Sequence, residues 1–236
     1  MKATTWEFKN RAWIFGLMLG LTFPMYTIDP QNSAAALATW LAPRLAMDAT
    51  LVARLLFALA AALLVLAALI RTWASSYLHA QVVYASEVKT KSLVADGPYR
   101  FVRNPLYLGN VLMAFAMGAM MSRPGFITVV VAMLVFSYRL IFREEADMEA
   151  GQGEQYEQYR KAVPRLWPAL WPRIPSAGSL PSWTEGFTAE SYYWGFAAAV
   201  GAFALTLKLW VFFVILGASL VLFWVAPAVL IKKSSS

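Results

Sequence analysis

Six apolar segments dominate this sequence and constrain its fold more than any other feature. A helix needs about 20 apolar residues to cross a membrane. Windows almost free of Asp, Glu, Lys and Arg occupy residues 12–28, 51–70, 106–121, 126–138, 191–207 and 209–231. Arg54 interrupts the second window near one end, where a long side chain can reach the lipid headgroups. The sequence therefore predicts an all-α integral membrane protein with about six transmembrane helices.

The composition excludes several other classes. Hydrophobic residues make up 60% of the 236 residues, charged residues make up 14%, and the mean hydropathy is +0.55. A soluble domain is about half apolar and a quarter charged, so this chain is too apolar for one, and for a disordered or nucleic-acid-binding chain. With no cysteine and with His79 as the single histidine, neither a thiolate site nor an HExxH zinc site can form. We expect no metal and no nucleic-acid partner.

The basic residues predict the orientation of the spans. Most of the 20 Lys and Arg residues lie in the N-terminal tail, in residues 71–103, in residues 139–190 and in the C-terminal tail. The exceptions are Arg44, Arg54, Arg123 and Lys208. Because cytoplasmic loops carry the excess of positive charge, we expect both termini and both long polar segments to be cytoplasmic. The window 12–28 is expected to be a retained helix, since it is too long for a secretory signal and lacks a small-residue cleavage pattern.

The first polar segment leads into the third span. Gly97-Pro98 is a turn signal, and Asn104-Pro105 supplies an N-cap followed by proline at the first helical position. The third span therefore begins with free amides at the cytoplasmic interface. Such a helix end can hold an anion, for example a carboxylate.

Three side chains of this segment recur at intervals of four residues, namely Tyr99, Arg103 and Tyr107. If helical geometry extends across the turn, they line one face and could contact a ligand. The alternative is a well-capped helix whose arginines follow the inside rule and whose tyrosines anchor at the interface. Residues alone leave both interpretations open.

The second polar segment continues the fourth span. Glu144 and Glu145 lie beyond its apolar part, and paired carboxylates at the mouth of a bundle can hold hydroxyls or an ammonium group. A solvated helix end would explain them equally. Spacing of i, i+3, i+4 and i+7 predicts a short amphipathic helix over Tyr156, Tyr159, Arg160 and Val163. The chain has neither a P-loop nor a Rossmann glycine motif.

Taken together, two motifs resemble the isoprenylcysteine carboxyl methyltransferase family. They are GPYRFVRNPLYLG at 97–109 and the stretch from REE at 143–145 to GEQYEQYRKAVP at 153–164. The similarity spans roughly residues 82–168. In that family S-adenosylmethionine binds at the cytoplasmic end of the bundle, in a pocket made by these inter-helix segments.

The resemblance implies particular roles. Donor contacts are implied for Lys91, Ser92, Leu93, Val94, Tyr99, Asn104, Pro105, Leu106 and Tyr107, with Glu144 and Glu145 as carboxylate partners. Asn104 stands where the family usually has histidine, and it cannot carry charge. Leu140 stands where the family places a substrate-binding arginine, so Arg139 or Arg143 must serve instead. Arg103, beside the capped helix end, is expected to orient an anionic acceptor.

We therefore expect three regions: an N-terminal transmembrane hairpin at 1–81, a methyltransferase core at 82–175 and a C-terminal transmembrane hairpin at 176–236. The last hairpin lies outside the similarity and shapes a substrate entrance or a dimer contact. The predicted partners are membrane lipid and a lipophilic or lipid-modified substrate.

The predicted reaction moves a methyl group from S-adenosylmethionine to a lipophilic acceptor, first of all an isoprenylcysteine-like carboxylate. Phospholipid amines and thiols are alternative acceptors, because a fold does not fix the acceptor. A sterol-type reductase using NADPH is a different possibility. Such reductases usually carry an acidic residue after the motif glycine, where this chain has Asn110. A non-catalytic membrane scaffold or transporter is a third class; the predicted spans show no charge near mid-membrane to favour transport.

Overall fold

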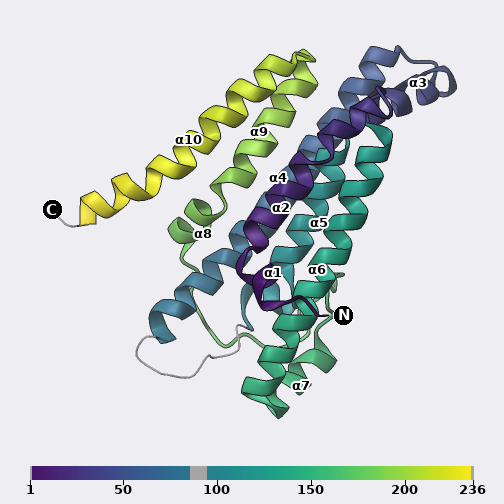
Figure 1. Cartoon of the computed structure of the whole chain (residues 1–236). Coiled ribbons are helices and arrows are strands. Elements are labelled where there is room, and N and C mark those ends of the chain that lie inside the picture. The colour runs from purple at the N-terminus through teal and green to yellow at the C-terminus, as the bar shows by residue number, and fades with distance from the viewer. Residues whose placement is uncertain (1, 86–94, 235–236) are drawn as a thin grey trace.

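The computed structural model describes residues 2–85 and 95–234 (Figure 1). Every regular element in these ranges is a helix, and one isolated bridge joins Asn32 to Ser122. The elements in chain order are α1 (Thr5–Lys9), α2 (Arg11–Gly20), η1 (Phe23–Thr27), α3 (Ser33–Leu45), α4 (Ala49–Ala85), η2 (Gly97–Arg100), α5 (Pro105–Gly118), α6 (Arg123–Gln152), α7 (Glu154–Ala162), α8 (Trp183–Ala189), α9 (Ser191–Thr206) and α10 (Leu209–Ser234). The predicted all-α class is confirmed.

Two described helices are long and apolar enough to cross a membrane. They are α4, over Ala49–Leu78, and α6, over Arg123–Gln152, and they contain the predicted spans 51–70 and 126–138. The helix α5 and the part of α10 from Leu209 to Phe223 are apolar but shorter. Within the described residues, two of the six predicted spans are therefore confirmed as helices of membrane-crossing length, and the six-span arrangement stays a prediction.

The first predicted span, 12–28, is not a single helix. The helix α2 ends at Gly20, and the 3-10 helix η1 follows with Pro24 in its first turn. Proline has no N–H to continue an α-helical ladder, so the apolar window is divided there. The helix α3 falls outside the predicted spans and is capped by Asn32, whose side chain accepts a hydrogen bond from the amide of Ala35.

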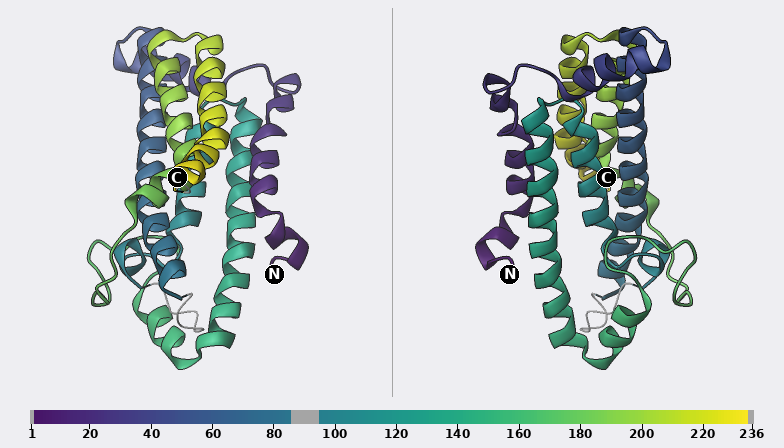
Figure 2. Two further views of the ribbon diagram at one scale, coloured as in Figure 1. Left: turned by 90° about the vertical axis from the view of Figure 1, so that its left-hand side faces the viewer. Right: turned by 90° about the vertical axis from the view of Figure 1, so that its right-hand side faces the viewer.

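The predicted turn at 122–125 begins the fourth span rather than preceding it. Ser122 is the N-cap of α6, and its hydroxyl accepts a hydrogen bond from the amide of Gly125 at 3.3 Å. Pro124 occupies the first turn, where its missing N–H costs nothing. The connection from α5 is therefore short, and α5 and α6 pack as a hairpin (Figure 2).

The helix α4 is the centre of the bundle and contacts α3, α5, α8 and α9. Its buried face carries small side chains, including Ala60, Ala67 and Ala68, which allow neighbouring helices to approach closely. The helices α9 and α10 pack on one another in the same way, because a Cβ added at Gly195 would collide with the Cβ of Ser219. The C-terminal hairpin is thus fixed to α4 through α9.

The helix α6 runs on beyond its apolar part and carries polar residues out of the bundle. Gly153, with a φ of +54°, ends α6 and allows the chain to reverse into α7. The predicted amphipathic helix is confirmed, since Tyr156 and Tyr159 of α7 are buried. Figure 2 shows that the chain then returns past the start of α5 to α8. One end of the bundle therefore gathers the start of α5, the end of α6 and the segment after α7.

Candidate functional site

The site is built from two segments that lie far apart in the sequence and are joined by backbone hydrogen bonds. The amide of Arg103 donates to the carbonyl of Pro164 at 2.8 Å, and the amide of Ala169 donates to the carbonyl of Phe101 at 2.9 Å. The segment before α5 is thus held in an extended register against the chain that follows α7. Both predicted motifs contribute to a single structure.

Asp96 and Tyr99 fix the first of these segments. The carboxylate of Asp96 is buried and accepts hydrogen bonds from the Ser176 hydroxyl and from the amides of Ala177 and Ser179. Burial opposes its ionisation, but these donors outweigh burial and lower the pKa of Asp96 below its ordinary value. The carbonyl of Tyr99 accepts a hydrogen bond from the hydroxyl of Tyr159 at 2.8 Å.

Tyr99, Arg103 and Tyr107 would share one face only if helical geometry extended across the turn, and that condition is not met. The 3-10 helix η2 ends at Arg100, and α5 begins only at Pro105. Helical geometry is interrupted between them, and Arg103 lies in the break. Burial raises the pKa of the Tyr99 phenol, which is therefore neutral at physiological pH.

Tyr107 and Glu144 meet directly. The Tyr107 hydroxyl, in the first turn of α5, donates a hydrogen bond to Oε1 of Glu144 at 2.8 Å. Tyr107 is buried, whereas Glu144 is partly exposed on α6. A carboxylate and a phenol from the two motifs therefore lie within reach of one small molecule.

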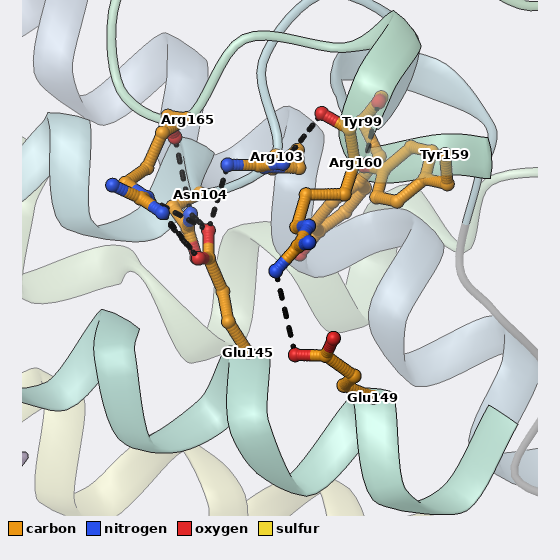
Figure 3. A network of polar contacts seen from close by, with 8 residues as sticks. All are labelled: Tyr99, Arg103, Asn104, Glu145, Glu149, Tyr159, Arg160 and Arg165. Carbon is orange, nitrogen blue, oxygen red and sulfur yellow. Dashed lines mark hydrogen bonds and ion pairs between the residues drawn. The ribbon is translucent and has the colours of Figure 1, made fainter. Parts of the chain in front are cut away.

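Glu145 makes a separate network, shown in Figure 3. Its Oε1 lies 3.0 Å from Nη2 of Arg103, and its Oε2 lies 2.9 Å from Nη2 of Arg165. Adjacent residues on an α-helix point about 100° apart, so Glu144 and Glu145 serve different partners. Glu145 is buried, and one carboxylate between two guanidinium groups satisfies both its charge and its hydrogen bonds.

Asn104 occupies the N-cap position of α5, but its side chain makes no capping hydrogen bond. Instead its amide donates to the carbonyl of Arg165 at 3.0 Å and more weakly to Oε1 of Glu145. The expectation of a side-chain cap is wrong because tertiary partners compete for the same amide. The first-turn amides of α5 thus receive no acceptor from Asn104.

Pro105 and Leu106 complete the start of α5. Pro105 stands in the first turn and is buried. The carbonyl of Leu106 accepts a hydrogen bond from Nη1 of Arg71 at 2.9 Å. The other implied donor contacts, Lys91, Ser92, Leu93 and Val94, lie outside the described residues.

Arg139 and Arg143 both engage the N-terminal segment. Nη2 of Arg139 lies 2.7 Å from Oε2 of Glu7, and Nη1 of Arg143 donates to the carbonyl of Ala3. Leu140 between them is fully buried. Arg139 is therefore held by a carboxylate of α1, a partner that the two motifs do not indicate.

A buried polar network behind α5 was not predicted from the sequence. Arg71 of α4 lies 2.5 Å from Oε2 of Glu190, and Nη1 of Arg71 also donates to Oδ1 of Asn110 at 2.7 Å. The hydroxyls of Ser75 and Tyr193 bond to Glu190 and Asn110 respectively. Gly109 makes room for this arginine, because a Cβ there would collide with the Arg71 side chain.

A signal for this pair was present in the sequence. Arg71 directly follows the apolar window 51–70, and Glu190 directly precedes the window 191–207. Opposite charges at the ends of two spans favour a pairing when those ends share one side. The two residues are 119 positions apart, so the sequence did not by itself indicate that they pair.

Among the described residues, no group of three or more His, Asp or Glu side chains is arranged to hold a metal ion. The polar atoms that face the two motifs are instead carboxylate oxygens, phenol oxygens, amides and guanidinium groups. These suit an organic ligand with both charged and hydroxyl groups.

Residues 55–155 match the family described as phospholipid methyltransferase. The chain is 38% identical over 93 residues to the Protein-S-isoprenylcysteine O-methyltransferase of Schizosaccharomyces pombe, an overlap of 38% of each chain. It is 29% identical over 123 residues to the cobalt-zinc-cadmium resistance protein CzcN of Cupriavidus metallidurans, covering 52% of this chain and 54% of that protein. No solved structure gives a significant match.

The family resemblance carried by the two motifs is thus confirmed for the segment 55–155. The match contains α5, α6 and most of α4. It includes Arg71, Tyr107, Glu144 and Glu145 but not Glu190. The chain spans between about two fifths and about half of the length of these two relatives.

Proposed function

We propose that this protein is an integral-membrane methyltransferase that moves a methyl group from S-adenosylmethionine to a lipophilic acceptor. The match to the phospholipid methyltransferase family and the likeness to an isoprenylcysteine methyltransferase support this activity. The observation that carries it is the 2.8 Å hydrogen bond between Tyr107 and Glu144. It unites the two motif segments at the end of the bundle where the family binds its donor.

The residues present fit this donor. S-adenosylmethionine offers a carboxylate, an ammonium group and ribose hydroxyls. The first-turn amides of α5 are not capped by Asn104, so a ligand carboxylate can accept from them at the positive end of the helix dipole. Glu144 can accept hydrogen bonds from the ammonium group or from a hydroxyl.

The donor would supply a methyl group already activated on a sulfonium sulfur. The protein then has to align the acceptor in line and exclude water. Arg103 is 6% exposed at its side chain, and Glu145 and the carbonyl of Arg160 hold it in place. We assign Arg103 to the orientation of an anionic acceptor and Arg139 to the same acceptor from α6.

An isoprenylcysteine-like carboxylate is the first candidate acceptor, because the relative that is 38% identical bears that name. A phospholipid amine is the second, because the matching family is described as phospholipid methyltransferase. In either case the acceptor reaches the site from the bilayer between helices. We propose a multi-pass arrangement with both termini and the site on the cytoplasmic side.

Calorimetry with the purified protein tests donor binding. We expect S-adenosylmethionine to bind in the low-micromolar to millimolar range usual for enzyme substrates. Glu144→Ala and Tyr107→Ala should each weaken binding at least about tenfold, which corresponds to about 1.4 kcal/mol. Glu154→Ala is the matched control, since this carboxylate is exposed on α7 and should leave the affinity unchanged.

Three results would contradict the proposal or its details. Binding of NADPH with no binding of S-adenosylmethionine would assign the protein to the reductases. Wild-type affinity in both site variants, with the fold retained, would reject the site. A screen with labelled donor and membrane lipid extract tests the acceptors. If neither lipid amines nor prenylcysteine carboxylates become labelled, both acceptors are rejected.

A further inference from the structure

A strongly basic pocket lies beside the site, and neither Tyr107 nor Glu144 lines it. Its volume is about 440 Å³. It is formed by Arg103 and by the chain from the end of α7 to residue 173. The charged and aromatic residues that line it are Arg103, Arg160, Lys161, Arg165, Trp167 and Arg173.

The positive charges around this pocket exceed the carboxylates that accompany them. Glu145 is shared by Arg103 and Arg165, and no carboxylate lines the pocket. The side chain of Arg173 is exposed and has no ion-pair partner among the described residues. Nε of the buried Arg103 has no hydrogen-bond partner there either. The pocket therefore has unused donors and net positive charge, which suit an anion.

The remaining two cations, Arg160 and Lys161, each pair with a carboxylate that does not line the pocket. Arg160 lies 3.4 Å from Glu149, and Lys161 lies 2.8 Å from Glu157 one turn away on α7. Both pairs are largely exposed, and exposed pairs contribute little and release readily. Neither carboxylate neutralises the pocket itself.

Exposed apolar side chains adjoin the pocket. Trp167 and Trp171 are each 75% exposed, and Leu170 is 87% exposed. Exposing two indoles and a leucine to water is unfavourable, whereas tryptophan favours the interface of a membrane. The arrangement of cations beside exposed tryptophans fits a headgroup and its adjoining acyl chains.

The position of this segment along α4 matches the depth of lipid headgroups. The amide of Ala169 donates a hydrogen bond to the carbonyl of Phe101. The ring of Phe101 packs against Trp73, with 5.9 Å between the ring centroids. Trp73 lies three residues beyond the apolar window 51–70, about 5 Å along the helix axis. The headgroup layer begins where the hydrocarbon core ends.

We propose that this pocket binds the headgroup of an anionic membrane phospholipid. The phosphate is held by guanidinium groups, whose planar donors match phosphate oxygens in pairs. Trp167, Leu170 and Trp171 lie among the upper acyl chains. The proposal concerns lipid binding and holds whether or not the protein transfers methyl groups.

Native mass spectrometry of the full chain in detergent micelles tests this site. The protein is titrated with phosphatidylglycerol, with phosphatidylcholine and with inorganic phosphate. We expect one saturable phosphatidylglycerol at least tenfold tighter than phosphatidylcholine. Arg160→Ala and Arg173→Ala should each weaken phosphatidylglycerol binding at least fivefold. Both side chains are partly or fully exposed, so neither substitution should unfold the chain.

Arg44→Ala and Lys208→Ala are the matched controls. Both remove an exposed cation, from α3 and from the turn between α9 and α10, at the opposite end of the bundle from this pocket (Figure 2). Phosphatidylglycerol affinity should be unchanged in both. Trp171→Ala should weaken the lipid but not inorganic phosphate, because only the lipid has acyl chains.

Equal binding of the two lipids would overturn the proposal, as would an equal loss in the control variants. Displacement of phosphatidylglycerol by millimolar inorganic phosphate, with Trp171→Ala neutral, would assign the pocket to a soluble phosphate compound instead. Wild-type affinity in both Arg160→Ala and Arg173→Ala would place the lipid elsewhere.

Discussion

The buried pair of Arg71 and Glu190 gives the sharpest test of how the C-terminal hairpin supports the site. Glu190→Leu removes a carboxylate that contacts both Nε and Nη2 of Arg71. The two side chains are 11% and 5% exposed, so water cannot replace the lost oxygens. An uncompensated guanidinium is left behind α5, next to the carbonyl of Leu106.

The expected cost follows from this burial. Removing one partner of a buried ion pair typically destabilises a protein by about 3–5 kcal/mol, because the other charge remains unpaired. Arg71→Met should cost a similar amount, since it strands the Glu190 carboxylate. Arg71→Met combined with Glu190→Leu should cost much less than the sum, because replacing a whole buried pair by apolar residues is often close to neutral. A coupling energy of at least about 3 kcal/mol, the upper end of the range usual for interacting pairs, is therefore expected.

Equilibrium unfolding in mixed micelles, followed by far-UV circular dichroism, measures the free energy of unfolding for the four proteins of the cycle. The exposed pair of Arg123 and Asp29 provides the comparison, with an N–O distance of 2.6 Å but an arginine side chain that is 58% exposed. Its cycle should show a far smaller coupling, because burial and not distance sets the energy. Additive effects at Arg71 and Glu190 would refute the reasoning.

Three further predictions follow from the site. Gly97→Ala should destabilise the fold by about 1–3 kcal/mol in the same unfolding assay, because φ is +56° and an added Cβ would collide with the ring of Tyr77; wild-type stability would contradict it. Because the pKa of Asp96 is lowered in the fold, its ionised carboxylate stabilises the fold above the unfolded pKa of about 3.9, and this stabilisation is lost as pH falls through the folded pKa. The difference in free energy of unfolding between wild type and Asp96→Asn should therefore shrink below about pH 4. An acid-titration difference that is flat would contradict this. Tyr159→Phe should cost about 1–3 kcal/mol because it leaves the buried carbonyl of Tyr99 without its donor, and an unchanged unfolding midpoint would show that the bond is dispensable.

Glu144 and Glu145 show that a sequence motif does not predict which partners its side chains contact. Both residues were expected to act together on the donor. On the helix they point in different directions, so Glu144 meets Tyr107 while Glu145 neutralises Arg103 and Arg165. The role of Glu145 in donor binding therefore remains a prediction, whereas the structure shows that it pairs with Arg103 and Arg165.

The sequence by itself determined where the long apolar helices α4 and α6 run, because a long apolar window is a local property and favours a helix in a membrane. It also predicted that residues 97–109 and 143–164 form one structure, which the bond from Tyr107 to Glu144 confirms.

Only the tertiary structure decided which polar groups pair. Asn104 gives its amide to Arg165 instead of capping α5, Arg139 binds Glu7, and Arg71 binds Glu190 across 119 residues. Each choice depends on competition between partners brought close by packing. The local sequence does not predict the outcome of that competition, because the energy of a buried polar group depends on everything that surrounds it.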